Sequence, residues 1–396
     1  MTPSIPPTPS TPNPSVPPSP STAASALPPI ASTASATPQA ATAASVDPVK
    51  LEEFMQRFVG DLGAAMSASL VVLGDELGLY RAMDAAGHPV SSAELAAMTD
   101  TDERYVREWL SAQAAAGYVQ YQADVRLFSL SPEQAFALAQ EDSPAYIPGA
   151  FQIASAMVKD EHKIAEAFRS GVGVGWHEHH PSLFEGTERF FRPNYAANLT
   201  GKWLPALEGI SERLVRGARV ADVGCGYGAS TILMAQAYPN SRFFGFDYHQ
   251  DSIERARERA RQAGVGDRTS FQVATAKDFP GENYDLVTFF DCLHDMGDPV
   301  GAAAHVRKTL ASGGAWMIVE PFAHDRLEEN LNPVGRVFYA ASTMLCTPAS
   351  RAQEVGLALG AQSGEKRMRE VVTAGGFGSF RRAAETPFNL IYEAKA

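Results

Sequence analysis

The sequence is poor in cysteine and has no long apolar run. Its three cysteines, Cys225, Cys292 and Cys346, lie far apart and form no CxxC pair, so neither a disulfide framework nor a cysteine zinc site is predicted. No stretch approaches the roughly 18 to 20 consecutive apolar residues of a spanning helix. These absences favour a reducing compartment, and we expect a cytoplasmic protein that does not associate with membranes.

Basic residues are also scarce. Lys and Arg number 33 against 45 Asp and Glu, which gives a net charge of −12. A chain of this charge has no overall attraction to nucleic-acid backbones or anionic lipid, so nucleic acid is not an expected partner. With 45% hydrophobic and 20% charged residues, the composition is that of a globular protein of about two domains.

The first 46 residues contain no charge and little that could form a core. They consist almost entirely of Pro, Ser, Thr and Ala, and Asp47 is the first charged residue. So little apolar surface cannot offset chain entropy, and we predict a disordered tail over 1–46. The first basic residue is Lys50, which argues against a secretory or organelle-targeting peptide. A proline-motif docking segment is the alternative.

A winged-helix pattern occupies residues 47–140. Apolar residues recur at helical spacing over 70–80, and two further helices are predicted to begin near Ser91 and Asp102. Two short alternating runs then predict a β-hairpin within 118–130. Three helices followed by a hairpin make a winged helix.

The charge on the third helix bears on whether this module binds DNA. Arg104 and Arg107 are accompanied by Asp102, Glu103 and Glu108, so no basic stripe is available to neutralise phosphates. We therefore expect a packing or dimerisation module, with DNA binding as the alternative.

Residues 141–214 are predicted to form a helical linker that covers an acceptor site. His177, His179 and His180 lie close together here, but on a strand the third would point away from the other two. We interpret the segment as a polar loop beside a pocket and expect no metal site.

From 215 to 396, apolar strands alternate with helices, which indicates a parallel sheet covered on both faces. The strand at 219–223 leads directly into a turn with three alternating glycines, and a helix follows at 229–237. The glycines are Gly224, Gly226 and Gly228. They let the backbone pass close to a ligand, and the helix N-terminus presents free amides.

A second strand ends in Asp247, about twenty residues past the glycine turn. A carboxylate at this spacing can accept hydrogen bonds from both ribose hydroxyls, so the pattern predicts a nucleoside site. A dinucleotide turn usually reads GxGxxG, whereas here the glycines alternate and Asp222 precedes them. This favours S-adenosylmethionine over NAD as the cofactor.

With these motifs the sequence resembles the class I S-adenosylmethionine-dependent methyltransferases. The resemblance covers about 216–396 and implies an α/β, Rossmann-like sheet of seven strands. The remaining strands match at 269–273, 284–290 and 316–320, with a closing hairpin at 377–382 and 388–393. With its winged helix, the chain is similar to small-molecule O-methyltransferases of bacteria and plants. That likeness implies a homodimer formed through the N-terminal helices.

The resemblance implies roles for the residues of the glycine turn and its neighbours. The three glycines would lie against the methionine part of the cofactor, with Asp222 near its ammonium group. Asp247 would bind the ribose, and Tyr248 would lie beside the adenine. The acid that many relatives carry after the third strand is missing, and we expect Thr275 and Ala276 to contact the adenine instead.

Two further positions come from the end of the fourth strand. Asp291 lies at its carboxyl end and is expected to face the cofactor's ammonium, or to cap the following loop. His294, in the segment His-Asp-Met-Gly-Asp, resembles the family's general base, and an imidazole with a pKa near 6.5 can accept a hydroxyl proton at neutral pH. The alternative is a histidine that pairs with Asp295 or Asp298 and holds the loop. Glu320 is a candidate to orient it.

We expect aromatic residues from two regions to form the acceptor pocket. The four principal candidates are Trp176, Tyr195, Phe322 and Tyr339. As a set they favour an apolar acceptor. The sequence thus predicts a methyltransferase that acts on a small molecule and favours a hydroxyl oxygen as the methyl acceptor. The alternatives are a winged-helix transcriptional regulator that responds to S-adenosylmethionine or another small molecule, and a catalytically silent binding protein.

Overall fold

The computed structural model describes residues 46–396. Of the tail predicted for 1–46, all residues except Val46 therefore lie outside the described part of the chain. Contacts divide the chain into a unit that ends at Phe54 and a second unit, Met55–Ala396. The second unit contains every contact discussed below.

The described N-terminal part has four helices before the hairpin, one more than predicted, because the segment predicted as one helix over 70–80 is divided at Leu77 and Gly78, with Gly78 in a left-handed conformation. The elements of this part are α1 (Pro48–Glu76), α2 (Leu79–Ala86), α3 (Ser92–Thr99), α4 (Glu103–Ala115), β1 (Gln120–Gln122), β2 (Leu127–Ser129) and α5 (Pro132–Leu138). The predicted helix starts are confirmed, because Ser91 accepts a hydrogen bond from the Glu94 amide and Asp102 accepts one from the Arg104 amide. Val71, Tyr80 and Trp109 belong to their shared apolar core.

Helix α1 departs from the sequence-based expectation. It has 29 residues, and by length and composition alone it could cross a membrane, with a mean hydropathy of 1.4 over its most apolar window. The search of the sequence for consecutive apolar residues did not single out this segment. Alanines such as Ala64, Ala65 and Ala68 raise the hydropathy of the segment without forming a continuous run of large apolar side chains. Only 17% of the window is buried.

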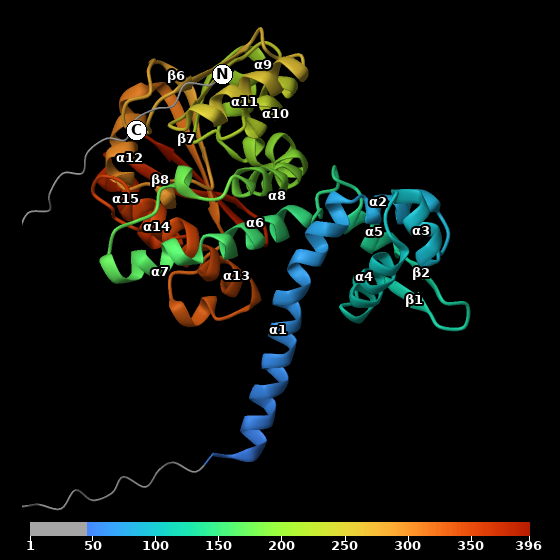
Figure 1. The fold of residues 1–396 in the computed structure, drawn as a ribbon. Coiled ribbons are helices and arrows are strands. Elements are labelled where there is room, and N and C mark those ends of the chain that lie inside the picture. Colours follow the sequence, from blue (N-terminus) through green and yellow to red (C-terminus); the bar gives the residue numbers. More distant parts are fainter. Residues whose placement is uncertain (1–45) are drawn as a thin grey trace, which may run out of the picture. The chain divides into compact units, whose positions relative to one another are not determined.

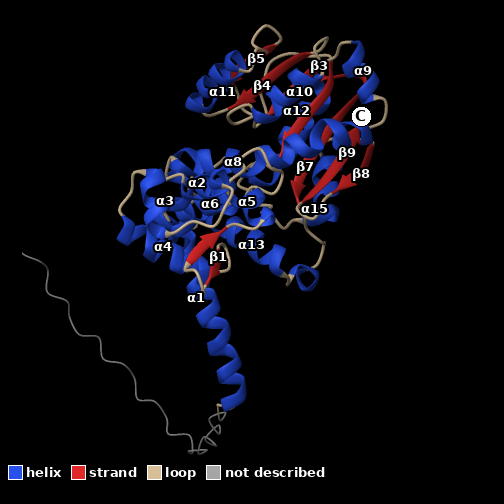
Figure 2. Cartoon of the chain, turned by 90° about the vertical axis from the view of Figure 1, so that its right-hand side faces the viewer, coloured by secondary structure: helices blue, strands red, loops and turns tan. Residues whose placement is uncertain are grey.

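The C-terminal part contains the predicted seven-stranded sheet. Its strands are β3 (Arg219–Val223), β4 (Arg242–Asp247), β5 (Thr269–Val273), β6 (Tyr284–Phe290), β7 (Leu310–Pro321), β8 (Ser379–Glu385) and β9 (Asn389–Lys395). They lie in the order β5-β4-β3-β6-β7-β9-β8, with β9 antiparallel to both β7 and β8. Among the described residues, the other strands are the short pair β1 and β2, apart from this sheet (Figure 2).

Helices cover both faces of this sheet. They are α9 (Ile210–Arg216), α10 (Ala229–Ala237), α11 (Gln250–Gln262), α12 (Pro299–Thr309) and α15 (Gly364–Ala374). One apolar core joins α10 and α11 to the sheet, and a second core joins α12 and α15 to the sheet. Figure 1 shows the strands between these two helix layers. Because helices cover both faces of the sheet, most residues of β6 and β7 are buried.

Two helical segments lie beside the carboxyl edge of the sheet. The first comprises α6 (Pro148–Lys159), α7 (Glu161–Ser170), η1 (Trp176–Glu178), α8 (Ser182–Asn198), η2 (Leu199–Trp203) and η3 (Leu204–Ala206). The second follows β7 and comprises η5 (Leu327–Asn330), α13 (Pro333–Ala341), η6 (Ser342–Cys346) and α14 (Thr347–Arg351). Both contribute side chains to the pocket described below.

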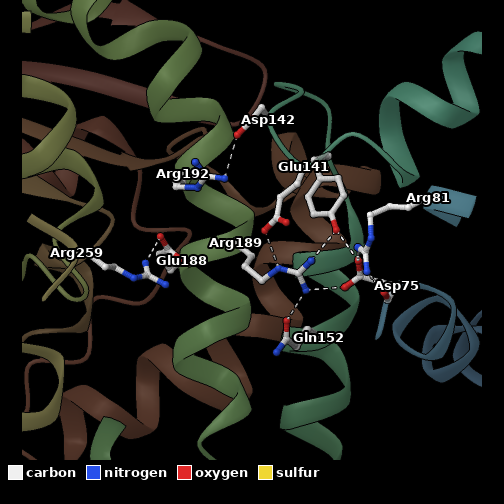
Figure 3. Close-up of polar contacts among 10 residues, drawn as sticks. Asp75, Arg81, Glu141, Asp142, Gln152, Glu188, Arg189, Arg192 and Arg259 are labelled. Atoms are coloured by element: carbon white, nitrogen blue, oxygen red, sulfur yellow. Dashed lines mark hydrogen bonds and ion pairs between the residues drawn. The ribbon is translucent and has the colours of Figure 1, made fainter. Parts of the chain in front are cut away.

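A buried ion cluster ties α8 to the N-terminal helices. Figure 3 shows Arg189 of α8 pointing toward Asp75 of α1, with Nη1 2.6 Å from Oδ2. Arg81 and the Tyr146 hydroxyl donate to the other carboxylate oxygen, at 3.0 and 2.7 Å. Burial raises the pKa of Asp75, but these donors outweigh it and leave that pKa below its ordinary value. The cluster fixes the position of a helix that forms one wall of the pocket.

Candidate active site

A pocket of about 420 Å³ lies at the carboxyl ends of β3, β4 and β6. This is the edge at which open parallel sheets bind ligands. Its aromatic lining includes Trp176, Phe184, Phe191, Tyr195, Tyr227, Tyr248 and Phe290. The lining also includes four acidic residues and one arginine, which are Glu188, Asp247, Asp291, Asp295 and Arg192. Glu188 is paired with Arg259, and Arg192 is paired with Asp142. The charge that a ligand would meet therefore comes mainly from Asp247, Asp291 and Asp295, which favours a cationic ligand over a phosphate.

The glycine turn places two of its three glycines on the pocket wall. Gly224 and Gly226 line the pocket in left-handed backbone conformations, with φ of 73° and 50°. A Cβ on Gly224 would lie 2.8 Å from the Cys292 sulfur. Gly228 does not line the pocket, contrary to expectation. A Cβ there would lie 3.0 Å from the Phe271 ring, so this glycine allows the turn to pack closely against the sheet.

Asp222 does not reach the pocket, which corrects the expected contact with the cofactor's ammonium. Its carboxylate is 1% exposed and accepts hydrogen bonds from Ser230 and Thr231 of α10, at 2.6 and 2.5 Å, and from Thr288 of β6, at 3.0 Å. Burial raises the pKa of Asp222, and the three hydroxyl donors oppose that rise. The residue joins the strand, the helix and the neighbouring strand beneath the turn.

Asp247 lies on the pocket wall at the end of β4, as predicted. Its two oxygens accept hydrogen bonds from the backbone amides of Gly226 and His249, each at 2.9 Å. Burial raises the pKa of Asp247, and the amide donors oppose the rise. The carboxylate is thereby oriented by the same turn that would hold a nucleoside. Tyr248 lines the pocket beside it and is 45% exposed.

Thr275 and Ala276 line the pocket, together with Ala274. The Thr275 hydroxyl donates to Asp278 at 2.7 Å, and its amide donates to the same oxygen at 2.8 Å. Asp278 itself does not border the pocket. The Thr275 hydroxyl is therefore used to shape its own loop, and a ligand here would meet mainly backbone and methyl groups.

Asp291 borders the pocket immediately after β6, in a left-handed conformation with φ of 50°. It accepts a hydrogen bond from the Tyr195 hydroxyl at 2.8 Å and one from the Asn389 amide group at 2.9 Å. Burial, with a further contribution from Glu320, raises the pKa of Asp291 to about 7. No cation in the described part of the chain forms an ion pair with it, so a cationic ligand would be its natural partner.

His294 is buried behind the pocket wall rather than exposed on it. Its side chain is 4% exposed, with Nδ1 2.5 Å from Glu320 Oε2 and Nε2 3.1 Å from Asp295 Oδ1. Burial opposes the charged imidazole, but the two carboxylates outweigh it and hold the pKa of His294 well above its ordinary value. The contact with Glu320 matches the suggested orienting role. Both ring nitrogens are engaged, however, which a general base acting directly on an acceptor does not fit.

Asp295 is the member of this group that reaches the pocket. Its Oδ2 accepts a hydrogen bond of 3.0 Å from the indole nitrogen of Trp176, which also lines the pocket. The other candidate partner of His294, Asp298, instead caps α12 by accepting from the Gly301 amide at 2.8 Å. The pair of His294 and Asp295 thus connects a buried imidazole to the acceptor space.

The acceptor wall only partly matches the prediction. Trp176 and Tyr195 line the pocket, but Phe322 and Tyr339 do not. Phe322 packs against the core between the sheet and α12, and Tyr339 lies on α13 away from the pocket. The insertion after β7 contributes small and polar residues instead, from α14 and just after it. These are Ala349, Ala352 and Gln353.

Sequence reasoning missed Gln353 and Phe184. The Gln353 amide group accepts from the Gly297 amide at 3.0 Å and donates to the Asp295 carbonyl at 2.9 Å, which fixes the loop that follows β6. The Phe184 ring stacks on His249 with a centroid separation of 4.7 Å. Phe184 begins an aromatic-rich stretch of the sequence that continues to Tyr195, which is a signal that could have found it, but nothing in the sequence around Gln353 marks it as a pocket residue.

The three neighbouring histidines face different surroundings. His177 lines the pocket, His179 is buried with Nδ1 3.2 Å from Asp160, and His180 contacts the Ser182 hydroxyl at 2.7 Å. This divergence agrees with their interpretation as parts of a loop beside a pocket.

The winged-helix module carries little free positive charge on α4. Arg104 pairs with Glu108 and Arg107 pairs with Glu103, at 2.6 and 3.3 Å. These contacts reduce the charge that the helix could offer to phosphates.

Two family models match the chain. A methyltransferase domain matches residues 214–375, and an Rv2258c-like winged HTH domain matches residues 64–140. Among curated proteins, the 27-O-demethylrifamycin SV methyltransferase of Amycolatopsis mediterranei is 34% identical over 100 residues, which are 25% of this chain and 36% of that enzyme. The chain matches 24% to 36% of the length of the first such relatives.

Solved structures share the fold over most of the chain. An O-methyltransferase from Nostoc punctiforme aligns with a TM-score of 0.66 and 20% identity, over 89% of this chain and 100% of that one. Human N-acetylserotonin methyltransferase, in complex with S-adenosylmethionine, aligns with a TM-score of 0.64 and 15% identity, over 90% and 100% of the two chains. The present chain thus joins a winged-helix domain at 64–140 to a methyltransferase domain at 214–375, in the two-domain arrangement of S-adenosylmethionine-dependent O-methyltransferases.

Proposed function

We propose that this protein transfers a methyl group from S-adenosylmethionine to a hydroxyl oxygen of a small, largely apolar molecule. The observation that carries the proposal is the pocket's charge. The charge on its wall comes mainly from Asp247, Asp291 and Asp295, and the first of these is an oriented carboxylate at the glycine turn. A cofactor with sulfonium and ammonium groups and no phosphate fits this wall, whereas a dinucleotide pyrophosphate would be repelled.

Specific residues would hold the cofactor. Asp247 would accept from the ribose hydroxyls, Gly224 and Gly226 would allow close approach of the methionine part, and Asp291 would pair with the ammonium in place of Asp222. When bound, S-adenosylmethionine supplies an activated methyl group on a sulfonium sulfur. The chain's own contribution is to align the acceptor between aromatic side chains and to exclude water from the pocket.

The hydroxyl proton requires a destination. We propose that the pair of His294 and Asp295 receives it, because Asp295 borders the pocket and His294 lies 3.1 Å behind it. Asp295 would accept the hydroxyl proton, and His294, whose pKa the two carboxylates hold well above its ordinary value, would act as an imidazolium that positions and stabilises Asp295. Glu320 holds the ring from the other side.

The test of this function has two stages. Calorimetric titration is expected to show binding of S-adenosylmethionine and no binding of NAD. A panel of phenols, alcohols and amines incubated with the isotope-labelled methyl donor is then expected to show labelling of a hydroxyl compound. Cofactor binding without labelling of any acceptor would support a catalytically silent binding protein. Salt-sensitive, sequence-specific DNA binding would support the regulator.

Cofactor affinity is expected to weaken as the pH falls. The pKa of Asp291, raised to about 7, means that its carboxyl gains a proton below neutrality and loses its attraction for an ammonium group. Ligand binding stabilises the charged form, so the dissociation constant should increase by up to about tenfold per pH unit below that pKa. Titrations between pH 5.5 and 8.5 measure this. Asp291→Asn should bind more weakly at pH 8 and show a flatter profile, and an equally steep profile in that variant would assign the titration elsewhere.

We further propose that two copies of the chain associate through α1. Its exposed apolar residues Met55, Phe58, Val59, Leu62 and Met66 are 43% to 69% exposed and lie at helical spacing. Covering such a stripe would remove apolar surface from water. A dimer in a reducing cytoplasm is consistent with the three free cysteines.

Placing charges on this stripe should separate the copies. The variant Phe58→Glu with Leu62→Glu is expected to have the mass of one chain, 42.4 kDa, and the unmodified protein twice that mass, by light scattering. The neighbouring exposed residue gives the control, Gln56→Glu, which should remain dimeric. A monomeric unmodified protein, or recruitment of the protein to neutral lipid vesicles through α1, would contradict the proposal.

A further inference from the structure

The Asp291 carboxylate is bound by a side chain that lies 98 positions away in the sequence. Asn389, the first residue of β9, donates from Nδ2 to Asp291 Oδ1 at 2.9 Å. Asn389 is 1% exposed, and its Nδ2 also faces the Glu320 carbonyl at 3.5 Å. The contact joins the residue that follows β6 to the beginning of β9, on the other side of β7.

The backbone around Asn389 is fixed by a turn and by the strand ladder. Its amide donates to the Thr386 hydroxyl at 2.9 Å, and its carbonyl accepts from the Thr386 amide at 2.8 Å. The carbonyl of the preceding residue, Phe388, accepts from the Phe322 amide at 2.8 Å, where the pairing of β7 with β9 begins. These bonds hold Asn389 beside Asp291.

A row of side-chain amides continues from Asn389 to the protein surface. Asn389 Oδ1 accepts from Asn194 Nδ2 at 2.8 Å, and Asn194 Oδ1 accepts from Asn198 Nδ2 at 2.8 Å. The row ends at the exposed Lys202, whose ammonium group donates to Asn198 Oδ1 at 2.9 Å. The asparagine row, Asn198, Asn194 and Asn389, therefore connects α8 and η2 to the carboxylate on the pocket wall.

The two ends of the asparagine row determine the direction of every amide in it. A lysine ammonium group can only donate hydrogen bonds, and an ionised carboxylate can only accept them. Between Lys202 and Asp291, each amide must therefore turn its oxygen toward the lysine and its nitrogen toward the carboxylate. Hydrogen-bonded groups aligned in this way polarise one another. The row thus favours the ionised form of Asp291 over the protonated form.

Asp291 needs this support because its surroundings oppose a negative charge. Burial raises its pKa, and its φ of 50° is a conformation that residues other than glycine rarely adopt. The titratable groups that face it are Glu320 of β7, Asp295 and His294 of η4 (Leu293–Asp295), and Tyr195 of α8. The two carboxylates oppose its ionisation, whereas the histidine and the tyrosine favour it. A hydrogen bond to the charged form adds to the favourable side.

We propose that Asn389 is a positioning residue for the cofactor, which holds the Asp291 carboxylate in place and in its charged form. The inference rests on the proposed function, in which Asp291 pairs with the ammonium group of S-adenosylmethionine. Asn389, Asn194 and Asn198 do not border the pocket. Replacing them would therefore change cofactor affinity through Asp291 and not through a lost contact with the ligand.

The pKa of Asp291 can be measured without any ligand. Carbon-13 NMR of the full-length protein, with aspartate labelled at its carboxyl group, follows the titration, and Asp291→Asn identifies the signal. Asn389→Leu removes the donor and should raise that pKa by about one unit. Asn194→Ala removes only the donor to Asn389 Oδ1 and should give a smaller rise. An unchanged pKa in these variants, shown to be folded by thermal unfolding, would overturn the proposal.

Another buried asparagine supplies the matched control. Asn330 is 3% exposed and donates to the His324 carbonyl at 2.9 Å, and it does not border the pocket. Asn330→Ala should lower Tm but leave the pKa of Asp291 unchanged. An equal shift of that pKa in Asn330→Ala would mean that any loosening of the fold moves it, and this too would overturn the specific role of Asn389.

Cofactor binding supplies a second readout, which a merely structural role would not move. The ratio of the S-adenosylmethionine dissociation constants of Asn389→Leu and the unmodified protein should rise from near one at pH 8.5 to about tenfold at pH 5.5. Titration of the cofactor itself cancels in this ratio. A ratio that stays constant with pH would overturn the proposal. No binding to the unmodified protein would instead refute the proposed function, and the NMR titration would still decide whether Asn389 controls Asp291.

Discussion

Replacing Asp247 by alanine is expected to weaken S-adenosylmethionine binding by at least about 100-fold. The carboxylate is held at the glycine turn by the Gly226 and His249 amides, at 2.9 Å each, and it faces the pocket. Hydrogen bonds to a charged group contribute about 1.5 to 3 kcal/mol each. Losing two ribose contacts therefore amounts to about 3 kcal/mol or more, and 1.4 kcal/mol corresponds to a tenfold change in affinity.

Two further variants separate the ribose contact from the shape of the turn. Asp247→Asn keeps one acceptor oxygen and should bind with an intermediate loss. Asp251→Asn changes the nearby exposed acid in the first turn of α11 and should leave affinity within about twofold. Calorimetric titration measures all three, and thermal unfolding shows whether each is folded. A folded Asp247→Ala protein with near-normal affinity would remove the main support for the nucleoside site.

The sheet could be predicted closely because its signals are local. The strand at 219–223 and the helix at 229–237 have the predicted bounds, since a buried apolar run, a glycine turn and a helix follow one another without interruption. Helix α1 was harder, because its apolar side chains are largely exposed and small residues separate them. Periodicity records which residues are apolar but not whether another surface covers them.

The site was predictable where one backbone turn determines it and not where distant segments meet. Asp247 reaches the pocket because it ends a strand that the local sequence predicts, about twenty residues after the glycine turn. Asp222 has the same chemistry, but the hydroxyls of Ser230, Thr231 and Thr288 surround it, and no spacing rule reveals that these three converge. Cys346 likewise meets His294 only through packing of the segment after β7.

The acceptor wall shows the same limit. Phe322 and Tyr339 belong to the insertion after β7, where neither a regular strand nor a long helix fixes the direction of a side chain. The insertion turns α14 toward the pocket, through Gln353 and its bonds to the Gly297 amide and the Asp295 carbonyl. Composition alone favours aromatic residues as ligand contacts, whereas this packing selects small and polar ones.

Replacing His294 by alanine is expected to lower kcat at least about 100-fold while the dissociation constant of S-adenosylmethionine stays within about threefold. Positioned acid–base groups typically contribute factors of about 10² to 10⁴, and His294 does not border the pocket where the cofactor would bind. The same substitution leaves the buried carboxylates of Glu320 and Asp295 without the positive ring between them. Breaking such buried pairs costs about 3 to 5 kcal/mol, so a lower Tm should accompany the loss of turnover.

His294→Asn separates these two effects. Its amide group can still donate to Glu320 and should recover part of the lost stability, but it carries no positive charge to position and stabilise the Asp295 carboxylate, so kcat should remain low. The measurements are kcat and KM with the acceptor found in the labelling panel, the cofactor dissociation constant, and Tm. If His294→Asn is stable and turns over within about fivefold of the unmodified enzyme, the histidine only holds its loop. The hydroxyl proton must then leave through another group on the pocket wall, for which Asp291, with its pKa of about 7, is the next residue to replace.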